Sequence, residues 1–319
     1  SGRPMSISVA RNPMVPDAYR EILGQITAAN EAGLTMTGQV APRAVGLILG
    51  LECTLNPFLT NPVYREIADR PLDEKVAALR DPGYRERLLA DAGERNRDKL
   101  GGSLISRFDL LFEIADEPDY EPSLDTSIGA RAARSGRTAE EIALDALLAD
   151  DGHGLIYLPF LNYVDGNLDG CHEMLVHPHT VPGLGDGGAH VGTICDGSFP
   201  TTLLSYWGRD RDHDRIPLPF LVQRHCRDTA RTVGLFDRGV IAPGYRADLN
   251  VVDFDRLRLH KPEIVHDLPA QGRRLLQRAD GWRHTIVAGH ETYHDGVATE
   301  ALPGRLIRGA QPAPNGARS

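Results

Sequence analysis

The residue types best suited to chemistry lie in a glycine-rich stretch from Leu175 to Thr193, with the sequence LVHPHTVPGLGDGGAHVGT. Asp186 stands inside the run Gly185–Gly188, and His190 follows four residues later. Glycines beside an acid let the backbone turn sharply and let a ligand approach the carboxylate closely. A carboxylate and an imidazole presented in this way are typical of acid–base or metal-assisted hydrolysis. Asp-Gly is also common turn chemistry, so the loop alone leaves a structural role for Asp186 open.

Two other features of this stretch suggest different chemistry. His177 and His179 form an H-x-H pair, and alternate residues of a strand face the same side, as metal ligands must. Pro178 lies between them and argues against a central strand, so we predict a turn before a strand instead. Gly183–Gly188 formally matches GxGxxG, but a dinucleotide loop needs a strand directly before it and a helix at its end. An aspartate in the loop would also repel a pyrophosphate, so no dinucleotide cofactor is predicted.

Composition limits the classes of function. The chain has 319 residues, is 41% hydrophobic and carries a net charge of -9, which is typical of a globular protein with one large or two smaller domains. The acidic balance argues against general affinity for nucleic acid or anionic membranes. Four cysteines without a CxxC pattern predict reduced thiols and fit a cytoplasmic location. They are Cys53, Cys171, Cys195 and Cys226.

The elements that must position the loop begin with a βαβ unit. Residues 4–11 alternate like a half-buried strand, and residues 17–32 have apolar positions at helical spacing, with Asp17 before them and Gly33 after. Residues 34–41 form a second predicted strand. A strand, a helix and a strand in so short a length favour a parallel sheet.

The middle of the chain is predicted to be mostly helical. Residues 43–60 are expected to form an irregular loop, and the charged residues 62–98 a helical surface insertion or lid. Residues 123–149 have a two-helix pattern, in which Thr138 and Glu141 form a capping box. A buried strand is predicted at 154–162, helices at 167–176, 198–208 and 216–234, short strands and turns from Gly239, and a loose tail from 309.

Three blocks of the sequence resemble the amidohydrolase superfamily, in particular its D-aminoacylase branch, the N-acyl-D-amino-acid deacylases. In that family the last barrel strand ends in an aspartate within D-G-x-x-H, which Asp186 and His190 match. GVIAPGYRADLNVVDFD, residues 239–255, is similar to the family's return from barrel to β-sandwich. TIVAGHETYHDGVATEALPGRLIR, residues 285–308, is similar to the family's closing strands.

The resemblance implies an α/β fold, a distorted (β/α)₈ TIM-like barrel with a small β-sandwich, and a site at the carboxyl ends of the barrel strands. Residues 1–235 would then form the last three or four barrel strands, interrupted by the helical insertion 62–98. Residues 236–308 would form part of the β-sandwich, and 309–319 a loose tail. The front strands, with a His-x-His metal pair, would belong to a missing N-terminal half of the same polypeptide.

For activity, the resemblance implies hydrolysis of the C–N amide bond of an N-acyl (D-)amino acid by metal-activated water, with zinc as the cofactor. Asp186 would bind the metal, accept the water's proton and pass it to the leaving amine. His190 would polarise the substrate carbonyl or bind its carboxylate, and the alternative is a histidine that packs the loop. These two residues are the predicted catalytic pair.

Four residues are predicted to bind the substrate. Gly187 and Gly188 flank the catalytic carboxylate, and Arg43, just after strand 34–41, could hold a substrate carboxylate through two parallel hydrogen bonds. Asn162, at the end of strand 154–162, stands where the family places a polar residue. Packing, capping or surface roles are the alternatives for Arg43 and Asn162. His225, on a helix that would pack outside the barrel, is predicted to be structural.

The chain departs from the family at a metal ligand. Ser8-Val9-Ala10 stands where the deacylases carry a histidine in a context such as ISHHK. A shifted ligand set, one metal instead of two, and a role other than hydrolysis are therefore open alternatives. For the function as a whole, the alternatives are a cyclic-amide hydrolase of the hydantoinase or dihydroorotase kind, and an inactive fragment or non-catalytic protein with this fold.

Overall fold

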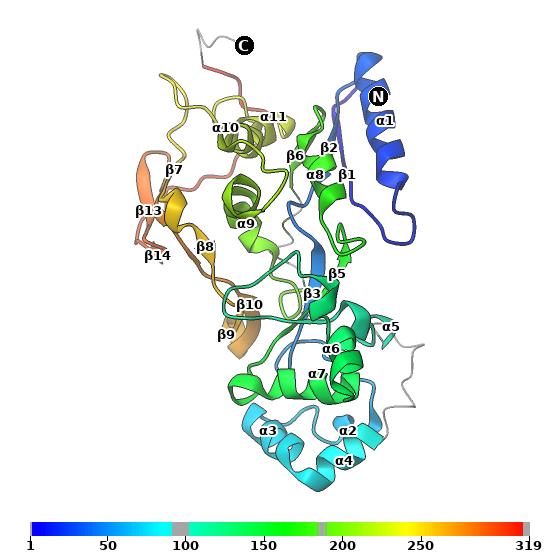
Figure 1. Cartoon of the computed structure of the whole chain (residues 1–319). Coiled ribbons are helices and arrows are strands. Elements are labelled where there is room, and N and C mark those ends of the chain that lie inside the picture. Colours follow the sequence, from blue (N-terminus) through cyan, green and yellow to red (C-terminus); the bar gives the residue numbers. More distant parts are fainter. Residues whose placement is uncertain (1, 91–101, 184, 186–187, 189, 315–319) are drawn as a thin grey trace.

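The structure is a computed structural model that describes residues 2–90, 102–183, 185, 188 and 190–314. Three parts can be followed in Figure 1. A parallel sheet lies beside helix α1, a mainly helical part with a second sheet lies at the opposite end, and the C-terminal strands lie to one side. The fold is therefore a mixed α/β arrangement, as predicted.

The parallel sheet is built on the predicted βαβ unit. Strand β1 (Met5–Ser8), helix α1 (Ala18–Glu31) and strand β2 (Met36–Val40) follow one another. β1 pairs parallel with β2, and β2 pairs parallel with β6 (Thr180–Pro182) on its other side. The prediction of a parallel βαβ unit is confirmed, and the sheet order is β1-β2-β6.

The two faces of this sheet differ. On the side of α1, a Cβ added to Gly38 would lie 2.9 Å from Val9 Cγ2 and 3.2 Å from Ile26 Cδ1. Glycine is therefore required where the helix approaches the sheet closely. On the other face, Gln39 Nε2 donates a hydrogen bond to Ser6 Oγ (2.7 Å) at an exposed position. One face is thus closed by apolar packing, and the other is polar and open to solvent.

Between β2 and β6 the chain builds a separate antiparallel sheet. Strands β3 (Val45–Leu49), β4 (Phe112–Glu113) and β5 (Ile156–Leu161) pair in the order β3-β5-β4. The prediction of a loop over 43–60 is therefore wrong for β3. The buried strand predicted at 154–162 is confirmed as β5, but it is antiparallel to β3 and does not extend the parallel sheet. The described residues thus contain three parallel strands, and β5 is not a fourth.

Helices pack on this antiparallel sheet. They are α2 (Pro62–Arg65), α3 (Leu72–Arg80), α4 (Pro82–Ala90), α5 (Gly102–Ile105), α6 (Ile128–Ser135) and α7 (Ala139–Leu148). The predicted capping box of Thr138 and Glu141 is present at the start of α7. Leu79, Leu147 and Leu158 share one buried apolar cluster. The described part of segment 62–98 is helical and contributes buried side chains such as Leu79 to this cluster. Its role as a surface insertion or lid stays a prediction, and residues 91–98 lie outside the described residues.

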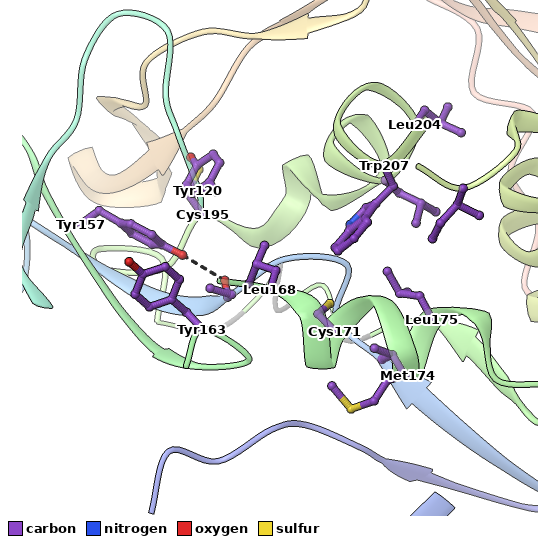
Figure 2. Packing of buried hydrophobic residues seen from close by; sticks show 14 of the residues in the cluster. Tyr120, Tyr157, Tyr163, Leu168, Cys171, Met174, Leu175, Cys195, Leu204 and Trp207 are labelled. Carbon is purple, nitrogen blue, oxygen red and sulfur yellow. Dashed lines mark hydrogen bonds between the residues drawn. The ribbon is translucent and has the colours of Figure 1, made fainter. Parts of the chain in front are cut away.

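The segment that follows β5 packs beside the parallel sheet. It contains α8 (Asp169–Val176), α9 (Phe199–Ser205), α10 (Leu218–Gln223) and α11 (Thr229–Thr232), with π-helical turns at Tyr206–Asp210 and Arg224–Asp228. Figure 2 shows Trp207 and Leu204 in the same apolar cluster as Cys171, Met174 and Leu175 of α8. The helices predicted over 167–176, 198–208 and 216–234 are confirmed.

The C-terminal region consists of short strands, as predicted. Strands β7 (Leu249–Val252), β12 (Trp282–Val287), β13 (His290–His294) and β14 (Val297–Ala298) form a sheet in the order β14-β13-β12-β7. Two-stranded sheets are formed by β8 (Arg258–Leu259) with β11 (Ala279–Asp280), and by β9 (Glu263–Leu268) with β10 (Gly272–Leu276). The tail is tied down at Gln311, whose N–H donates to Gly234 O (2.8 Å) and whose carbonyl accepts from Phe236 N (2.9 Å). The prediction of a loose tail is wrong at this residue.

Short 3₁₀ segments complete the secondary structure of the described residues. They are Phe108–Leu110, Leu124–Thr126, Ala149–Gly152, Asp196–Ser198, Phe254–Arg256 and Pro269–Gln271. The four cysteines are free thiols, as predicted. Within the described part of the chain, no helix combines the length and the apolar character needed to cross a bilayer.

Candidate active site

The carboxyl ends of β1, β2 and β6 lie along one edge of the parallel sheet. Pairing continues past the ends of the strands, since Val9 N donates to Gln39 O (2.9 Å) and Gly183 N donates to Val40 O (2.8 Å). The glycine-rich loop follows β6 directly at this edge. Asp186 and Gly187, two of the predicted site residues, lie outside the described residues, and their roles stay predictions.

His190 and Gly188 are the predicted loop residues that the structure describes, and both are exposed. His190 has a φ of 52°, and its carbonyl accepts hydrogen bonds from Thr193 N (2.8 Å) and Ile194 N (2.9 Å). Thr193 O in turn accepts from Ile48 N of β3 (2.7 Å). The backbone of His190 thus begins a turn that ties the loop to the antiparallel sheet. Its exposed imidazole remains available to a ligand, and its catalytic role stays a prediction.

The chain passes from the parallel to the antiparallel sheet through residues 41–44, called the junction here. Each of its four backbone carbonyls accepts a hydrogen bond from a buried side chain. Asn162 Nδ2 donates to Ala41 O (3.3 Å) and Arg43 O (3.2 Å), and Trp207 Nε1 donates to Pro42 O (2.5 Å). Tyr157 Oη donates to Ala44 O (3.2 Å), the dashed line in Figure 2. The junction is thereby held rigidly behind the site edge.

Asn162 joins the end of β1 to the junction. It is fully buried and has a φ of 68°, in the left-handed region that Asn tolerates better than most residues. Its Oδ1 accepts from Arg11 N (2.9 Å), and its backbone N–H donates to Arg11 O (2.8 Å). Its side chain is thus used for structural contacts within the protein, and its role in binding substrate remains a prediction.

Arg43 holds the segment that follows the glycine-rich loop. It is 2% exposed. Its Nη1 donates to Ser198 Oγ (3.0 Å), and its Nη2 donates to Cys195 O (2.9 Å) and approaches Asp196 Oδ1 at 3.4 Å. A substrate carboxylate would have to compete with Asp196 for this guanidinium. The contacts seen here are those of a residue that positions 195–198, and substrate binding by Arg43 stays a prediction.

Aromatic rings enclose the Arg43 guanidinium. Its Cζ lies 3.8 Å from the centroid of Tyr120 and 4.7 Å from that of Phe199, within the range of cation–π contacts. Burial lowers the pKa of Arg43, but Tyr120, Tyr157 and Asp196 outweigh burial and raise the pKa overall. Arg43 therefore stays charged although it is buried.

A pocket of about 260 Å³ opens between the ends of β2 and β6 and helix α9. Its walls are mostly apolar, with Asp196 and His225 as the ionisable side chains. It is lined by Pro42, Pro182, Gly183, Gly185, Asp196, Gly197, Phe199, Pro200, Leu203 and His225. Gly183 and Gly185 of the glycine-rich loop line this pocket, so it is a concave space at the described part of that loop.

His225 and Asp196 are the residues in this pocket that sequence reasoning did not assign to the site. Burial lowers the pKa of His225, and its Nδ1 has no hydrogen-bond partner among the described residues. The helical spacing of the sequence predicts which face of its helix His225 occupies, but it does not predict that this face lines a pocket. Asp196 had one sequence signal, its place in CDGS directly after the loop block.

The family of the chain follows from its sequence as a whole. Residues 2–293 match the amidohydrolase family. The chain belongs to this family. The predicted family is therefore confirmed, and the match includes the junction, β6 and the glycine-rich loop.

Solved structures similar to this amidohydrolase come from the branch that the sequence blocks indicate. A D-aminoacylase matches 93% of this chain and 48% of its own, with 17% identity and a TM-score of 0.46. The N-acyl-D-glutamate deacylase of Bordetella bronchiseptica matches 98% of this chain and 49% of its own, with 18% identity and a TM-score of 0.45. The chain thus spans about half the length of these enzymes.

A curated relative matches a shorter stretch. The 5-methylthioadenosine/S-adenosylhomocysteine deaminase of Desulfitobacterium hafniense (strain DSM 10664 / DCB-2) is 35% identical over 86 residues. The match covers 24% of this chain and 20% of the deaminase.

The described residues at the site edge do not form a set of metal ligands. Ser8 is exposed at the end of β1, whereas Val9 is fully buried in the apolar core. An arginine such as Arg43 offers only donors to a metal. Within the described residues, two groups of His, Asp and Glu side chains converge, and neither includes a residue of this edge. One group is His284, Glu291 and His294, and the other is Asp169, His213 and Asp214. Zinc at this edge would therefore need ligands from outside the described residues.

The H-x-H pair is not part of this edge. His177 Nε2 lies 3.2 Å from Thr27 Oγ1 of α1, and Thr180 N donates to His177 O (3.3 Å) as the chain turns into β6. His179 packs edge-on against His177. The pair lies in the turn that precedes β6, as predicted.

Proposed function

We propose that this amidohydrolase hydrolyses the C–N amide bond of a small N-acyl amino acid, with Asp186 as the proton shuttle. The family match over residues 2–293 carries this proposal, because it includes the loop with Asp186. The position of the loop after β6, at the carboxyl edge of a parallel sheet, supports it. The adjoining pocket of about 260 Å³ supports a small substrate.

The proposed proton transfer is assigned to one residue of this chain. The Asp186 carboxylate takes a proton from the attacking water as oxygen adds to the amide carbon, and passes it to the nitrogen as the C–N bond breaks. His190, exposed at the end of the same loop, is proposed to contact the substrate carbonyl or carboxylate. Gly187 and Gly188 are proposed to let the substrate approach Asp186.

We further propose that a second part of the polypeptide completes the site. The face of the parallel sheet with Ser6 and Gln39 is polar and open, whereas parallel strands are normally covered on both faces. The chain also spans about half of the deacylases that it matches. In this proposal, a further part of the polypeptide would cover this face and supply the ligands of the predicted zinc ion.

A second candidate function is hydrolytic deamination. The local 35% identity to a deaminase favours it. Deamination also adds water at a carbon that bears nitrogen, but it releases ammonia instead of a carboxylic acid. The two functions therefore differ in a product that is easily measured.

The complete product of the gene that encodes this chain, with and without added Zn²⁺, should be incubated with four substrate classes. These are N-acyl-D-amino acids, their L enantiomers, a hydantoin and 5-methylthioadenosine. Release of a free carboxylic acid and amino acid supports the proposal, ring opening indicates a cyclic-amide hydrolase, and ammonia indicates a deaminase. Turnover by this chain alone would contradict the need for a second half, and inactivity of the complete product towards all four classes would contradict hydrolysis.

Asp186→Asn in the complete enzyme should lower kcat by about 10²–10⁴-fold, the usual contribution of general acid–base catalysis. Asn keeps the shape of the side chain but cannot accept the proton. Asp151→Asn is a matched control, because Asp151 is 87% exposed and pairs with Arg80 on the surface. Both variants should keep the melting temperature of the wild type. Near-normal turnover of Asp186→Asn would remove Asp186 from the mechanism.

A further inference from the structure

The C-terminal sheet carries a group of three potential metal ligands on the hairpin of β12 and β13. His284 on β12 and His294 on β13 lie directly opposite each other, so both side chains share one face of the sheet. In Figure 1, β13 lies on the side of the molecule opposite to α1. The group is therefore separate from the edge that carries the glycine-rich loop.

A β-bulge brings Glu291 to the same face. In a regular strand, residues three apart point to opposite faces, so Glu291 and His294 would be separated. The register shifts between Thr285 and Ile286, whose partners are Tyr293 and Glu291. The extra residue on β13 is Thr292, and it reverses the alternation. Glu291 thus joins the two histidines.

The ligand atoms converge closely. Glu291 Oε1 lies 2.6 Å from His284 Nδ1 and 2.9 Å from His294 Nδ1. The two imidazole rings are 4.8 Å apart, edge to face. Zinc binds nitrogen and oxygen at about 2.0–2.2 Å, which places tetrahedral ligand atoms roughly 3.3 Å apart. Lengthening these two separations by about 0.7 Å and about 0.4 Å would therefore admit an ion.

The surroundings suit an ion with open coordination positions. The side chains of His284, Glu291 and His294 are 38%, 40% and 58% exposed, so an ion and water can reach them. Asp295 Oδ2 lies 3.5 Å from His294 Nε2. A carboxylate at the far nitrogen can hold the proton on Nε2 once a metal replaces the proton on Nδ1, as in many zinc sites.

The other converging group of the described residues is less suitable. Asp169, His213 and Asp214 are all exposed. Arg211 Nη2 lies 2.5 Å from Asp169 Oδ1 and would repel a cation there. In the described part of the chain, the ion pairs of Glu291 are with His284 and His294, and the nearby Arg283 bonds to Asp295 and Asp253 instead.

We propose that His284, Glu291 and His294 bind a divalent transition metal, of which Zn²⁺ is the representative, on the C-terminal sheet. Two imidazoles and one carboxylate suit Zn²⁺, Ni²⁺ or Cu²⁺ better than Mg²⁺ or Ca²⁺, which prefer oxygen ligands alone. The ion would link β12 to β13 across the bulge. This site does not depend on the proposed hydrolysis.

The test is a Zn²⁺ titration of the full chain against a chromophoric chelator, with Co²⁺ absorption as a report of coordination. His284→Gln, Glu291→Gln and His294→Gln should each remove one equivalent of bound Zn²⁺, or weaken its binding by at least about 100-fold, since changes beside zinc ligands already cost 10–100-fold. His290→Gln on β13, outside the group, and His213→Gln at the other group are the controls. Both should bind Zn²⁺ as the wild type does.

A thermal measurement makes the result independent of spectroscopy. Zn²⁺ should raise the melting temperature of the wild type and of His290→Gln, but not that of the three ligand variants. Each ligand variant removes a different side chain, so a folding defect in one leaves the other two informative. Equal Zn²⁺ affinity in the wild type and His294→Gln would overturn the proposal, and so would a wild type that binds Mg²⁺ as tightly as Zn²⁺.

Discussion

The two sheets beside the junction differ in how completely this chain covers them. In β5, Ile156 and Leu158 are 0% and 1% exposed, and helices of this chain close the cluster around them. In β1, Ser6 and Ser8 are both exposed on the polar face of the sheet that also carries Gln39. The antiparallel sheet is thus covered by helices of this chain, whereas the parallel sheet is covered on the α1 side alone. Covering of both faces is the normal state of parallel strands.

The junction between the two sheets is buried like the antiparallel sheet, and not exposed like the polar face of the parallel sheet. Arg43 and Asn162 lie within it, and their side chains bond to atoms of the protein. A rigid support behind a site edge keeps catalytic groups within the narrow geometric limits that catalysis requires. The difference between the regions is that side chains of this protein hold the support of the site on all sides, whereas the polar face of the parallel sheet is open to solvent.

The largest stability effect is expected at the junction. Arg43→Met should lower the free energy of unfolding by about 3–5 kcal/mol, because it breaks a buried ion pair with Asp196. Arg80→Met, which removes an exposed partner of Asp151, should cost at most about 1 kcal/mol. Urea unfolding of both variants checks this. Equal midpoints would mean that the junction is no more tightly held than the surface.

A matched pair of apolar truncations tests the two sheets directly. Leu158→Ala should cost about 2–5 kcal/mol, as buried leucines do. Met5→Ala should stay within about 0.5 kcal/mol, because Met5 is largely exposed. Urea unfolding measures both free energies. Met5 lies on the α1 side of β1, so a large cost for Met5→Ala would show that the apolar cover of this side extends to the start of the strand.

The smallest effect concerns pH and the pocket. Burial holds the pKa of His225 below its ordinary value of 6.5. The folded state therefore binds a proton on His225 less readily than the unfolded state does. The contribution of the neutral His225 to the free energy of unfolding is full above pH 6.5 and is lost as the pH falls below that value.

The test is to measure the melting temperature of each variant between pH 5 and 8 and to compare how steeply it falls with decreasing pH. His225→Gln should lose less stability on acidification than the wild type, and His290→Gln should follow the wild type. The reduction is expected to be partial, since burial also lowers the pKa of His172 and His177. An unchanged slope in His225→Gln would show that the imidazole is solvated in solution.

Local patterns predicted the elements where apolar periodicity and capping agreed. Sequence patterns predicted the βαβ unit, the capping box at Thr138 and the turn around Pro178, because each depends on residues close in sequence. The strand Val45–Leu49 was missed, because a short apolar run has no periodicity to distinguish it from a loop. The antiparallel direction of β5 was missed because it is set by a partner more than a hundred residues away.

The sequence by itself determined the family, since the blocks around Asp186 and Asp248 depend on residue types and spacing. The tertiary structure alone decided that Arg43 meets Asp196, that His225 lines a pocket and that a bulge unites Glu291 with His284 and His294. These contacts join residues whose separation in the chain gives no sign of their distance in space. The physical reason is that packing and strand register, which bring such residues together, are settled by the whole fold and not by any one segment.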